Sequence, residues 1–522
     1  MAKKRLRKIT KWMLYVHRYT GFALSLLFLF WFISGFVMMY KSFPYLSKSE
    51  SLERTASIPG QNAFVESSAL IENIADLDKE EVHSIEIVSL LDRPVYRMQS
   101  KKGDFHCFFA DTGEQVPSVD TKEAKQIVDD FIKGEYTIKK VEPLDKLDQW
   151  TPRTRFLPYL PAYKVYLEDG KGTVCYVSSV TGEIFQKVNC ADKIWAWLGA
   201  IPHWIYFKDL RIQTQLWRDV VVGLSILGVV MCVAGLYMGI VRVRRKRQNQ
   251  FAFSPYKKVW FKWHHYTGFT FGLITFTWIL SGLFSMNPWK WSPSRSLSEE
   301  AQFHWQGGSL SPEWFIISPS EALRTFNERQ AVRVLEFIQF GGRPYYRATL
   351  SDGATRLFQA DGNSDQWTAN LSNEAYLNQI QALHPEATGL QIAELTDYDA
   401  YYYDKHRTRP LPVLKVDIND SANTSYYINP KTAEVLLRYE DTSRLNRWLY
   451  HGLHSLDFPG LFFRRPLWDI VVIILLLGGS SVSVTGLVLT GKWIKRKMRR
   501  SKRLSLTKYA RQSLVNRTKT YR

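Results

Sequence analysis

The stretch Val16–Gly35, VHRYTGFALSLLFLFWFISG, recurs 247 positions later as Trp263–Gly282, WHHYTGFTFGLITFTWILSG. Aligned without gaps, the stretches share His17 and His264, Tyr19–Phe22 and Tyr266–Phe269, Trp31 and Trp278, and Ser34–Gly35 and Ser281–Gly282. Each copy holds about 20 mostly apolar residues, which as a helix at ~1.5 Å per residue cross ~30 Å of hydrocarbon. The chain is therefore predicted to be a tandem duplication, with a transmembrane helix in each half that opens with a histidine.

A second set of matched residues lies before and within two further apolar runs. The offset is now 251 positions, and the pairs are Trp197 and Trp448, His203 and His454, Phe207 and Phe458, Trp217 and Trp468, and Gly235 and Gly486. This set predicts a second histidine pair at the membrane surface opposite to the first. His451 precedes His454 by three residues, so the two side chains could share one helical face.

Composition divides the chain into membrane and water-facing parts. Of 522 residues, 45% are hydrophobic and 14% aromatic, which argues against disorder. Two polar regions of roughly 150 residues separate the apolar runs, and each has the size of an ordinary domain. We expect an α+β membrane protein with four transmembrane helices in two tandem repeats, each repeat carrying an α+β domain outside the membrane.

The predicted order is a basic N-terminus (1–18), a first transmembrane helix (19–40), a first outer domain (41–194), an interfacial segment with His203 (195–219), a second transmembrane helix (220–241), a basic loop (242–265), a third helix (266–286), a second outer domain (287–445), an interfacial segment with His451 and His454 (446–469), a fourth helix (470–490) and a basic tail (491–522).

The net charge of +20 is placed at the helix ends, which argues for a lipid bilayer and against nucleic acid as its partner. Residues 1–18 hold 7 basic side chains, residues 242–262 hold 8 and residues 492–522 hold 13, with no acidic residue in any of the three. Positive flanks stay in the cytoplasm, so both termini and the central loop are predicted inside and both domains outside. The first apolar run is too long for a secretory signal and predicts an uncleaved anchor.

The outer domains contain helical and strand patterns and one loop of possible function. Thr121–Lys133 is predicted to be a helix capped by Thr121, and Leu371–Leu383 shows a helical pattern too. The loop Tyr398–Pro412, YDAYYYDKHRTRPLP, mixes aromatic and basic residues. It either packs its tyrosines on its own strands or binds an anionic aromatic ligand. The candidate ligand-binding residues are Tyr402, Tyr403, His406, Arg407 and Arg409.

The four matched histidines are candidate metal ligands. Ionisable residues at membrane depth are usually functional, and histidine is a standard axial ligand of haem iron. Two like halves with the same orientation are related by an axis along the membrane normal, where an iron can receive one imidazole from each half. On this geometry His17 and His264 would hold one haem near the cytoplasm, and His203 and His454 a second haem near the outer face.

Two glycines support the hypothesis of haem binding at the inner histidines, and the same residues also have an alternative explanation. Gly21 and Gly268 lie four residues after the inner histidines, on the same helical face, and leave room for a flat macrocycle. Alternatively, these glycines only permit close helix contacts and the histidines form hydrogen bonds at the headgroup boundary. The sequence has no CxxCH, CxxC, GxGxxG or GxxxxGK motif, so any redox cofactor is noncovalent. Of four cysteines, Cys175 and Cys190 could form a disulfide.

The chain resembles a known family, the PepSY-associated transmembrane helix proteins. These are iron-regulated membrane proteins that include the FoxB-like ferrisiderophore reductases. The resemblance rests on HRYTG and HHYTG in the repeated stretch, on LHSLDFPG at Leu453–Gly460, and on DTGE and VTGE hairpins at Phe108–Glu114 and Val177–Glu183. It covers nearly the whole chain. One departure is Ile201–Phe207, which lacks the glycine-rich sequence that follows His454 and leaves His451 as a substitute outer ligand.

The resemblance implies an inner-membrane protein with haem b, two haems in all, that carries electrons from a cytoplasmic or membrane donor to a periplasmic ferric siderophore or other ferric chelate. Carried over residue by residue, His17, His264, His203 and His454 fall where family members place membrane histidines. We therefore predict a transmembrane ferric-chelate reductase. The alternative is a membrane-anchored PepSY module that binds peptides or a protease without redox activity.

Overall fold

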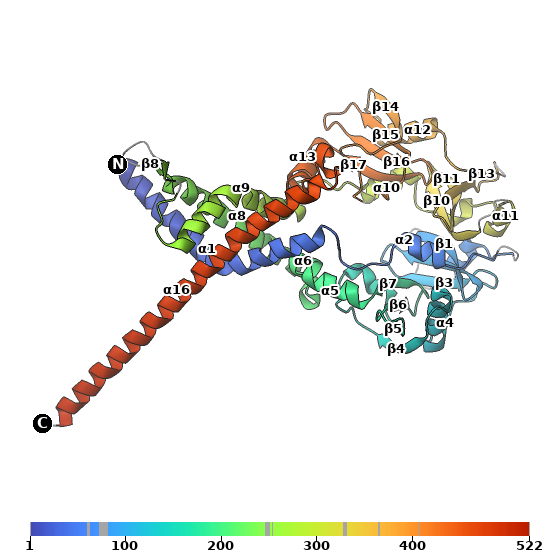
Figure 1. Cartoon of the computed structure of the whole chain (residues 1–522). Helices are drawn as coiled ribbons and strands as arrows, with labels where there is room; N and C mark the ends of the chain where they lie inside the picture. The colour runs from blue at the N-terminus through green and yellow to red at the C-terminus, as the bar shows by residue number, and fades with distance from the viewer. Residues whose placement is uncertain are drawn as a thin grey trace.

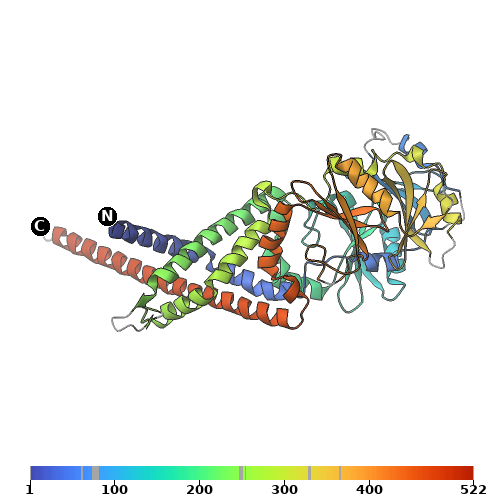
Figure 2. The ribbon, with the colours of Figure 1, turned by 90° about the horizontal axis from the view of Figure 1, so that it is seen from above.

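A computed structural model of the chain describes residues 2–59, 63–72, 82–245, 251–252, 254–326, 331–363, 366–405 and 407–520. Four long helices form one end of the molecule, and three β-sheets with their shorter helices form the other (Figure 1). Both ends of the chain lie beyond the helices on the side away from the sheets, where Figure 1 shows them well apart (Figures 1 and 2).

The long helices are α1 (Ala2–Met38), α8 (Thr214–Arg242), α9 (Val259–Ser285) and α16 (Leu467–Thr520). Within the described residues, these four are long and apolar enough to span a membrane. α1 and α9 each pack against both α8 and α16, so the four form one bundle (Figure 2). Large apolar side chains such as Leu26, Phe30 and Leu273 stay exposed on the bundle, as expected for a surface in lipid. The chain is a multi-pass membrane protein.

The helices begin earlier than predicted, and the histidines do not open them. His17 lies in the middle of α1, and α9 begins at Val259, five residues before His264. The reason is local: no Gly or Pro interrupts the N-terminal segment, and Lys, Arg and Leu are good helix formers. A helix that has formed in the apolar run therefore propagates back through the basic segment.

The two polar regions share one seven-stranded antiparallel sheet. Its strands, in spatial order, are β13 (Trp367–Thr368), β12 (Thr355–Gln359), β11 (Arg343–Leu350), β10 (Val332–Phe340), β1 (Val82–Leu90), β2 (Arg93–Ser100) and β3 (Phe105–Phe109). β1 from the N-terminal half pairs with β10 from the C-terminal half, with Ile85 opposite Phe337 and Glu86 opposite Glu336. The sheet therefore joins the two halves above the bundle.

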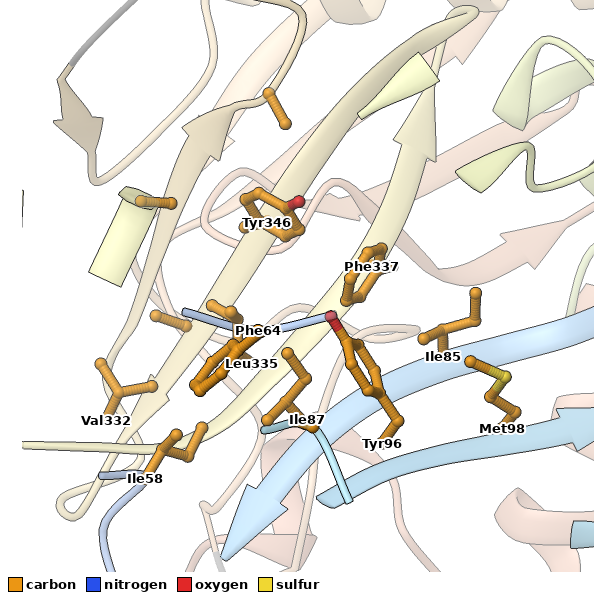
Figure 3. Packing of buried hydrophobic residues seen from close by; sticks show 14 of the residues in the cluster. Ile58, Phe64, Ile85, Ile87, Tyr96, Met98, Val332, Leu335, Phe337 and Tyr346 are labelled. Atoms are coloured by element: carbon orange, nitrogen blue, oxygen red, sulfur yellow. The ribbon is translucent and has the colours of Figure 1, made fainter. Parts of the chain in front are cut away.

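One face of this sheet carries the largest hydrophobic core. Alternate residues of β1, β2, β10 and β11, among them Ile87, Tyr96, Leu335, Phe337 and Tyr346, point to one side and pack together (Figure 3). The short helices α3 (Ser67–Glu72) and α11 (Pro319–Arg324) contribute to the same core. Because each such side chain contributes roughly 1.5–3 kcal/mol when buried, the join between the halves is stable.

Two four-stranded sheets lie closer to the bundle. The first contains β4 (Ile138–Leu144), β5 (Ala162–Leu167), β6 (Val174–Ser178) and β7 (Ile184–Val188), packed on α4 (Thr121–Ile132); the second contains β14 (Leu390–Leu395), β15 (Val413–Ile418), β16 (Ser425–Asn429) and β17 (Glu434–Tyr439), packed on α12 (Asn373–Leu383). Both predicted helices are confirmed. The cap of α4 is however Asp120 rather than Thr121, because the Asp120 carboxylate accepts the N–H groups of Lys122 and Glu123 in a capping box. Further short elements are α2 (Lys48–Arg54), α5 (Cys190–Leu198), α7 (Lys208–Arg211), α10 (Glu299–Gln306), α13 (Asp441–Arg447), α15 (Pro459–Phe462), β8 (Arg244–Arg245), β9 (Phe251–Ala252) and the 3₁₀ turns η2 (Thr154–Tyr159), η3 (Pro288–Lys290) and η4 (Pro312–Trp314).

All four cysteines are free, so the possible disulfide between Cys175 and Cys190 is not formed. Cys175 is buried in β6 beneath α4, whereas Cys190 is exposed at the next helix start. Burial raises the pKa of the Cys175 thiol to about 12, which keeps it protonated and unreactive at neutral pH.

Two arginines connect the seven-stranded sheet to the four-stranded sheets. Arg97 in β2 bonds Glu86 at 3.0 Å and Glu183 at 3.0 Å. At the matched position in β11, Arg347 bonds Glu336 at 2.7 Å and Glu434 at 2.7 Å. Both networks line a cavity of 2210 Å³ that lies between the sheets. The charges of these two networks are thus already paired within the protein.

Candidate cofactor site at two histidine pairs

The inner pair joins α1 to α9. The imidazole rings of His17 and His264 lie 6.0 Å apart between centroids, at an interplanar angle of 33°. His17 Nδ1 bonds the carbonyl oxygen of Met231 in α8 at 3.1 Å, and His264 Nδ1 bonds Thr485 Oγ1 in α16 at 3.0 Å. All four helices of the bundle therefore meet at this pair.

The outer pair lies between two short helices that follow the sheets. His203 belongs to α6 (Ala200–Trp204) and His454 to α14 (Leu453–Ser455), and their ring centroids are 5.9 Å apart. His203 Nδ1 contacts Ser34 Oγ at 3.0 Å, and His454 Nδ1 contacts Ser281 Oγ at 3.0 Å. The two serines are the last matched polar residues of the repeated stretch. Ser34 is 17 residues beyond His17, so the two pairs lie roughly 25 Å apart along the helix axis.

The hydrogen bonds decide which nitrogen of each ring carries the proton. The carbonyl oxygen of Met231 can only accept, so His17 Nδ1 must donate to it. The hydroxyls of Ser34, Ser281 and Thr485 each donate to a backbone carbonyl of their own helix, so their oxygens are free to accept a ring N–H. In all four histidines this leaves the lone pair on Nε2, which is the state required of a metal ligand.

Two matched tryptophans fix the ends of the short histidine helices. Trp217 Nε1 donates to the carbonyl oxygen of Trp204 at 2.8 Å, and Trp468 Nε1 donates to that of Ser455 at 2.9 Å. Each bond satisfies a free carbonyl next to a histidine, directly before the chain turns through a left-handed residue, Ile205 or Leu456. The sequence pairing of these tryptophans is the signal that could have identified them as positioning residues.

The spacing within each pair suits one metal between two imidazoles. A metal–nitrogen bond of about 2.0–2.1 Å plus about 1 Å from nitrogen to ring centre, counted on both sides, places the centroids about 6 Å apart. Both pairs have this separation. Among the described residues, no group of three or more His, Cys, Asp or Glu side chains could hold a bare metal ion. Two axial imidazoles alone suit an iron whose other ligands come from a macrocycle.

The surroundings of the inner pair leave room for such a group. A Cβ added at Gly235 would lie 2.7 Å from His17 Cε1, so α8 approaches the ring only because that residue is glycine. A Cβ at Gly268 would meet no described atom within 4 Å, and one at Gly21 only the Met231 sulfur at 3.8 Å. The described atoms therefore do not crowd Gly21 or Gly268, and the role of these glycines beside a macrocycle stays a prediction.

Matched tryptophans also leave unused donors near the outer pair. Within the described residues, the indole N–H groups of Trp31 and Trp278 are buried without a hydrogen-bond partner. Each lies three residues before the serine that holds an outer histidine. A buried orphan donor is costly, and a carboxylate of a bound macrocycle is one group that could accept from it. These observations fit a haem at both pairs.

His451 lies beside the outer pair and does not take part in it. It belongs to a π-helical segment, η5 (Trp448–Gly452), and its Nε2 is 3.5 Å from Arg295 Nη2. Burial, together with the charges of Arg295 and Arg447, lowers the pKa of His451 to about 3, so it is neutral at pH 7. The structure therefore pairs His203 with His454 rather than with His451.

The loop that contains Tyr398–Pro412 rests against the outer end of the bundle. Tyr402 is fully buried, stacks on Tyr427 and donates to the carbonyl oxygen of Pro410. Tyr403 reaches Asp457, just beyond His454, with its hydroxyl. Arg407 lies over Phe463 at 5.1 Å, Arg409 lies over Tyr402 at 5.5 Å, and His406 falls outside the described residues. The packing interpretation is therefore borne out for Tyr402, whereas binding of an anionic aromatic ligand by the loop stays a prediction.

Comparison with known proteins places this architecture in a family. The family model of the PepSY-associated TM region matches residues 14–384, well over half of the chain. The chain belongs to the PepSY-associated TM region family. No curated protein gives a match. Family membership indicates a membrane protein of the iron-regulated type. The match covers His17, His203 and His264 of this PepSY-associated protein but ends before His454, whose assignment therefore rests on its geometry.

Proposed function

We propose that this PepSY-associated protein is a haem b protein of the bacterial inner membrane that carries electrons outward to a ferric chelate, such as a ferric siderophore, and so releases its iron. The single observation that carries the proposal is the geometry of the two matched histidine pairs. In each pair the two ring centroids are about 6 Å apart, and both Nε2 atoms have a free lone pair. The cofactor would be two haems, whose iron takes up and gives up single electrons when bound.

The proposed arrangement of the chain follows the positions of its charges. Basic residues lie at the end of the bundle where both termini are found, so this end would face the cytoplasm and receive electrons from a cytoplasmic or membrane donor (Figure 1). The sheets would then lie in the periplasm. The halves would be two copies of one unit, related by an axis along the membrane normal that passes between the histidines of each pair.

The protein's own groups have three roles in this proposal. His17, His264, His203 and His454 would hold the iron, and their Nδ1 hydrogen bonds would fix the ring orientation. The apolar helices exclude water and provide a low-dielectric surrounding. The two pairs, roughly 25 Å apart along the axis, divide the membrane into shorter electron-transfer steps.

The test is the visible spectrum of the purified protein and of its histidine variants. The wild-type protein should show reduced-minus-oxidised bands of bis-histidine haem b with two components. His17→Ala or His264→Ala should remove one component, and His203→Ala or His454→Ala the other. His265→Ala is the matched control, because His265 is buried and adjacent to His264 but bonds the carbonyl oxygen of Gly239 and does not pair with another histidine.

A colourless protein expressed with adequate iron would overturn the proposal. So would a spectrum in which His265→Ala removes a component and His264→Ala does not. Reductase activity needs its own measurement, namely the reoxidation of the reduced protein by a ferric chelate followed by a ferrous-iron indicator.

One observation favours a second candidate function, the membrane-anchored PepSY binding module. The 2210 Å³ cavity between the sheets lies away from both histidine pairs and is large enough for a peptide segment. A haem-free protein that binds peptides through this cavity would support the module in place of the reductase.

A further inference from the structure

A small polar pocket lies on one side of the outer histidine pair. Its volume is 170 Å³, and its wall includes Asn287, Arg295, Asn446, Arg447, Tyr450 and His451. Tyr450 connects the pocket to the pair, since its ring lies 4.3 Å from that of His451 and 5.7 Å from that of His454. A group bound in the pocket would therefore be separated from the outer pair by about one aromatic ring.

Three lining residues of the pocket have no polar counterpart in the N-terminal half. At the offset that matches His203 to His454, Arg447 corresponds to Ala196, Tyr450 to Gly199 and His451 to Ala200. Ala196 and Ala200 are fully buried in a hydrophobic cluster. Each side supplies one histidine to the outer pair, so the pair itself does not account for the extra polar residues of the C-terminal side. These residues therefore have a separate purpose.

The charge of the pocket is positive. Arg447 is neutralised by Asp457 at 3.2 Å, both being almost fully buried. Arg295 donates to the Tyr439 hydroxyl at 3.1 Å and contacts His451 Nε2 at 3.5 Å, which are neutral groups, and it has no carboxylate partner in the described part of the chain. None of the described side chains that line the pocket is acidic.

We propose that this pocket binds one carboxylate arm of the ferric chelate, with Arg295 as the residue that recognises the anion. A guanidinium with spare donors prefers a carboxylate in a planar two-bond arrangement. Asn446 adds an oxygen, Oδ1, that is buried without a partner in the described chain and can accept from a hydroxyl of the same arm. The favoured substrate class is thus an anionic hydroxycarboxylate chelate of Fe(III).

The size of the pocket fixes how much of the chelate enters it. Sites for whole ligands measure roughly 300–1,000 Å³, so this pocket holds an arm while the iron centre stays outside, close to Tyr450. One electron from a reduced group at the outer pair would then convert Fe(III) to Fe(II), and no covalent bond of the protein would change. This step rests on the proposed function, whereas binding of the carboxylate arm does not.

The binding test uses gallium(III) citrate, which resembles the ferric complex and resists reduction. Titration calorimetry on the full-length protein should show binding that Arg295→Gln weakens about tenfold, as expected for loss of a charge-assisted hydrogen-bond pair. Arg295→Lys should restore part of the affinity, because the charge returns without the planar fork. Arg153→Gln is the matched control on the N-terminal side, where Arg153 lies over Tyr206, the counterpart of Asp457.

The redox test compares oxidants of opposite charge. With dithionite-reduced protein, Arg295→Gln should slow reoxidation by ferric citrate about tenfold and leave reoxidation by hexaammineruthenium(III), a cation, unchanged or faster. The proposed binding site would be contradicted if Arg295→Gln slowed reoxidation by both oxidants equally. It would also be contradicted if Arg295→Gln left the affinity for gallium citrate unchanged. Loss of the outer spectral component in Arg295→Gln would also overturn it, because Arg295 would then bind a haem carboxylate. If a haem-free protein bound gallium citrate and this binding depended on Arg295, the carboxylate-binding proposal would stand and only the proposed electron-transfer function would be contradicted.

Discussion

The inner and outer histidine pairs have nearly the same internal geometry and different surroundings. Ring centroids are 6.0 Å apart in one pair and 5.9 Å in the other, and every Nδ1 is held by a group of the bundle. Around the inner pair, matched glycines of α8 and α16, Gly235 and Gly486, face matched histidines. Around the outer pair, alanines on one side correspond to Arg447 and His451 on the other.

This difference separates what a cofactor requires from what a substrate requires. A cofactor held on an axis between two halves takes the same contacts from both, so its residues stay matched. A substrate arrives from one side and needs recognition only there. The inner pair therefore has the features of an internal relay, whereas the outer pair has those of an exchange point, and the following variants test that distinction.

The largest effect is expected at the inner pair, from Gly235→Ala. The added methyl group would lie 2.7 Å from His17 Cε1, so the ring or α8 must shift at a cost of about 1–3 kcal/mol. The inner spectral component should be lost or broadened while the outer one remains. Gly239→Ala is the matched control in α8, because its Cβ would meet no described atom within 4 Å. A normal inner component in Gly235→Ala would contradict the close approach.

A smaller effect, confined to the outer pair, is expected from Ser34→Ala and Ser281→Ala. Each change removes the hydroxyl that accepts from Nδ1 of His203 or His454, and the loss of such a partner weakens metal sites about 10–100-fold. A redox titration should show a shifted midpoint for the outer component alone. Ser25→Ala is the control, because its hydroxyl is buried without a partner in the described chain. An equal shift of both components would mean that the two pairs do not behave separately.

The histidine pairing could be predicted from sequence because the same residues recur at fixed offsets. His17 and His264 are 247 positions apart, and His203 and His454 are 251 apart, so each pair had to occupy like places in the two halves. The spacing of apolar runs likewise predicted the four helices. Ligation itself stays a prediction, which the visible spectrum of the histidine variants tests.

Contacts between distant and unmatched residues could not be predicted. Arg295 and His451 are 156 residues apart, and neither has a counterpart that would reveal the contact. The pairing of β1 with β10 was missed for a related reason, since an edge strand shows no local signal of which other edge it joins. The start of α1 was missed because charged residues continue a helix as readily as apolar ones do.

The smallest expected effect is a pH dependence that arises only on the outer side. The pKa of His451 is lowered from its ordinary 6.5 to about 3 by burial and by Arg295, Arg447, His454 and Arg409, and Asp457 at 3.9 Å does not offset them. Below pH 6.5 the unfolded chain therefore binds more protons at this position than the folded chain, and folding stability falls as pH decreases. The loss is at most about 1.4 kcal/mol per pH unit, and it ends near the folded pKa.

His451→Asn should accordingly flatten the decline of the melting temperature between pH 6.5 and pH 4, as followed by calorimetry in detergent. His304→Ala is the control, because His304 is exposed on α10. The inner pair lies roughly 25 Å away along the helix axis, so its spectral component should melt with the same pH profile in both proteins. If the melting temperature fell equally in wild type and His451→Asn between pH 6.5 and pH 4, the proposed lowering of the His451 pKa would be contradicted. The arginines beside it would then be screened by solvent, and the outer side would lose the electropositive character that distinguishes it from the inner pair.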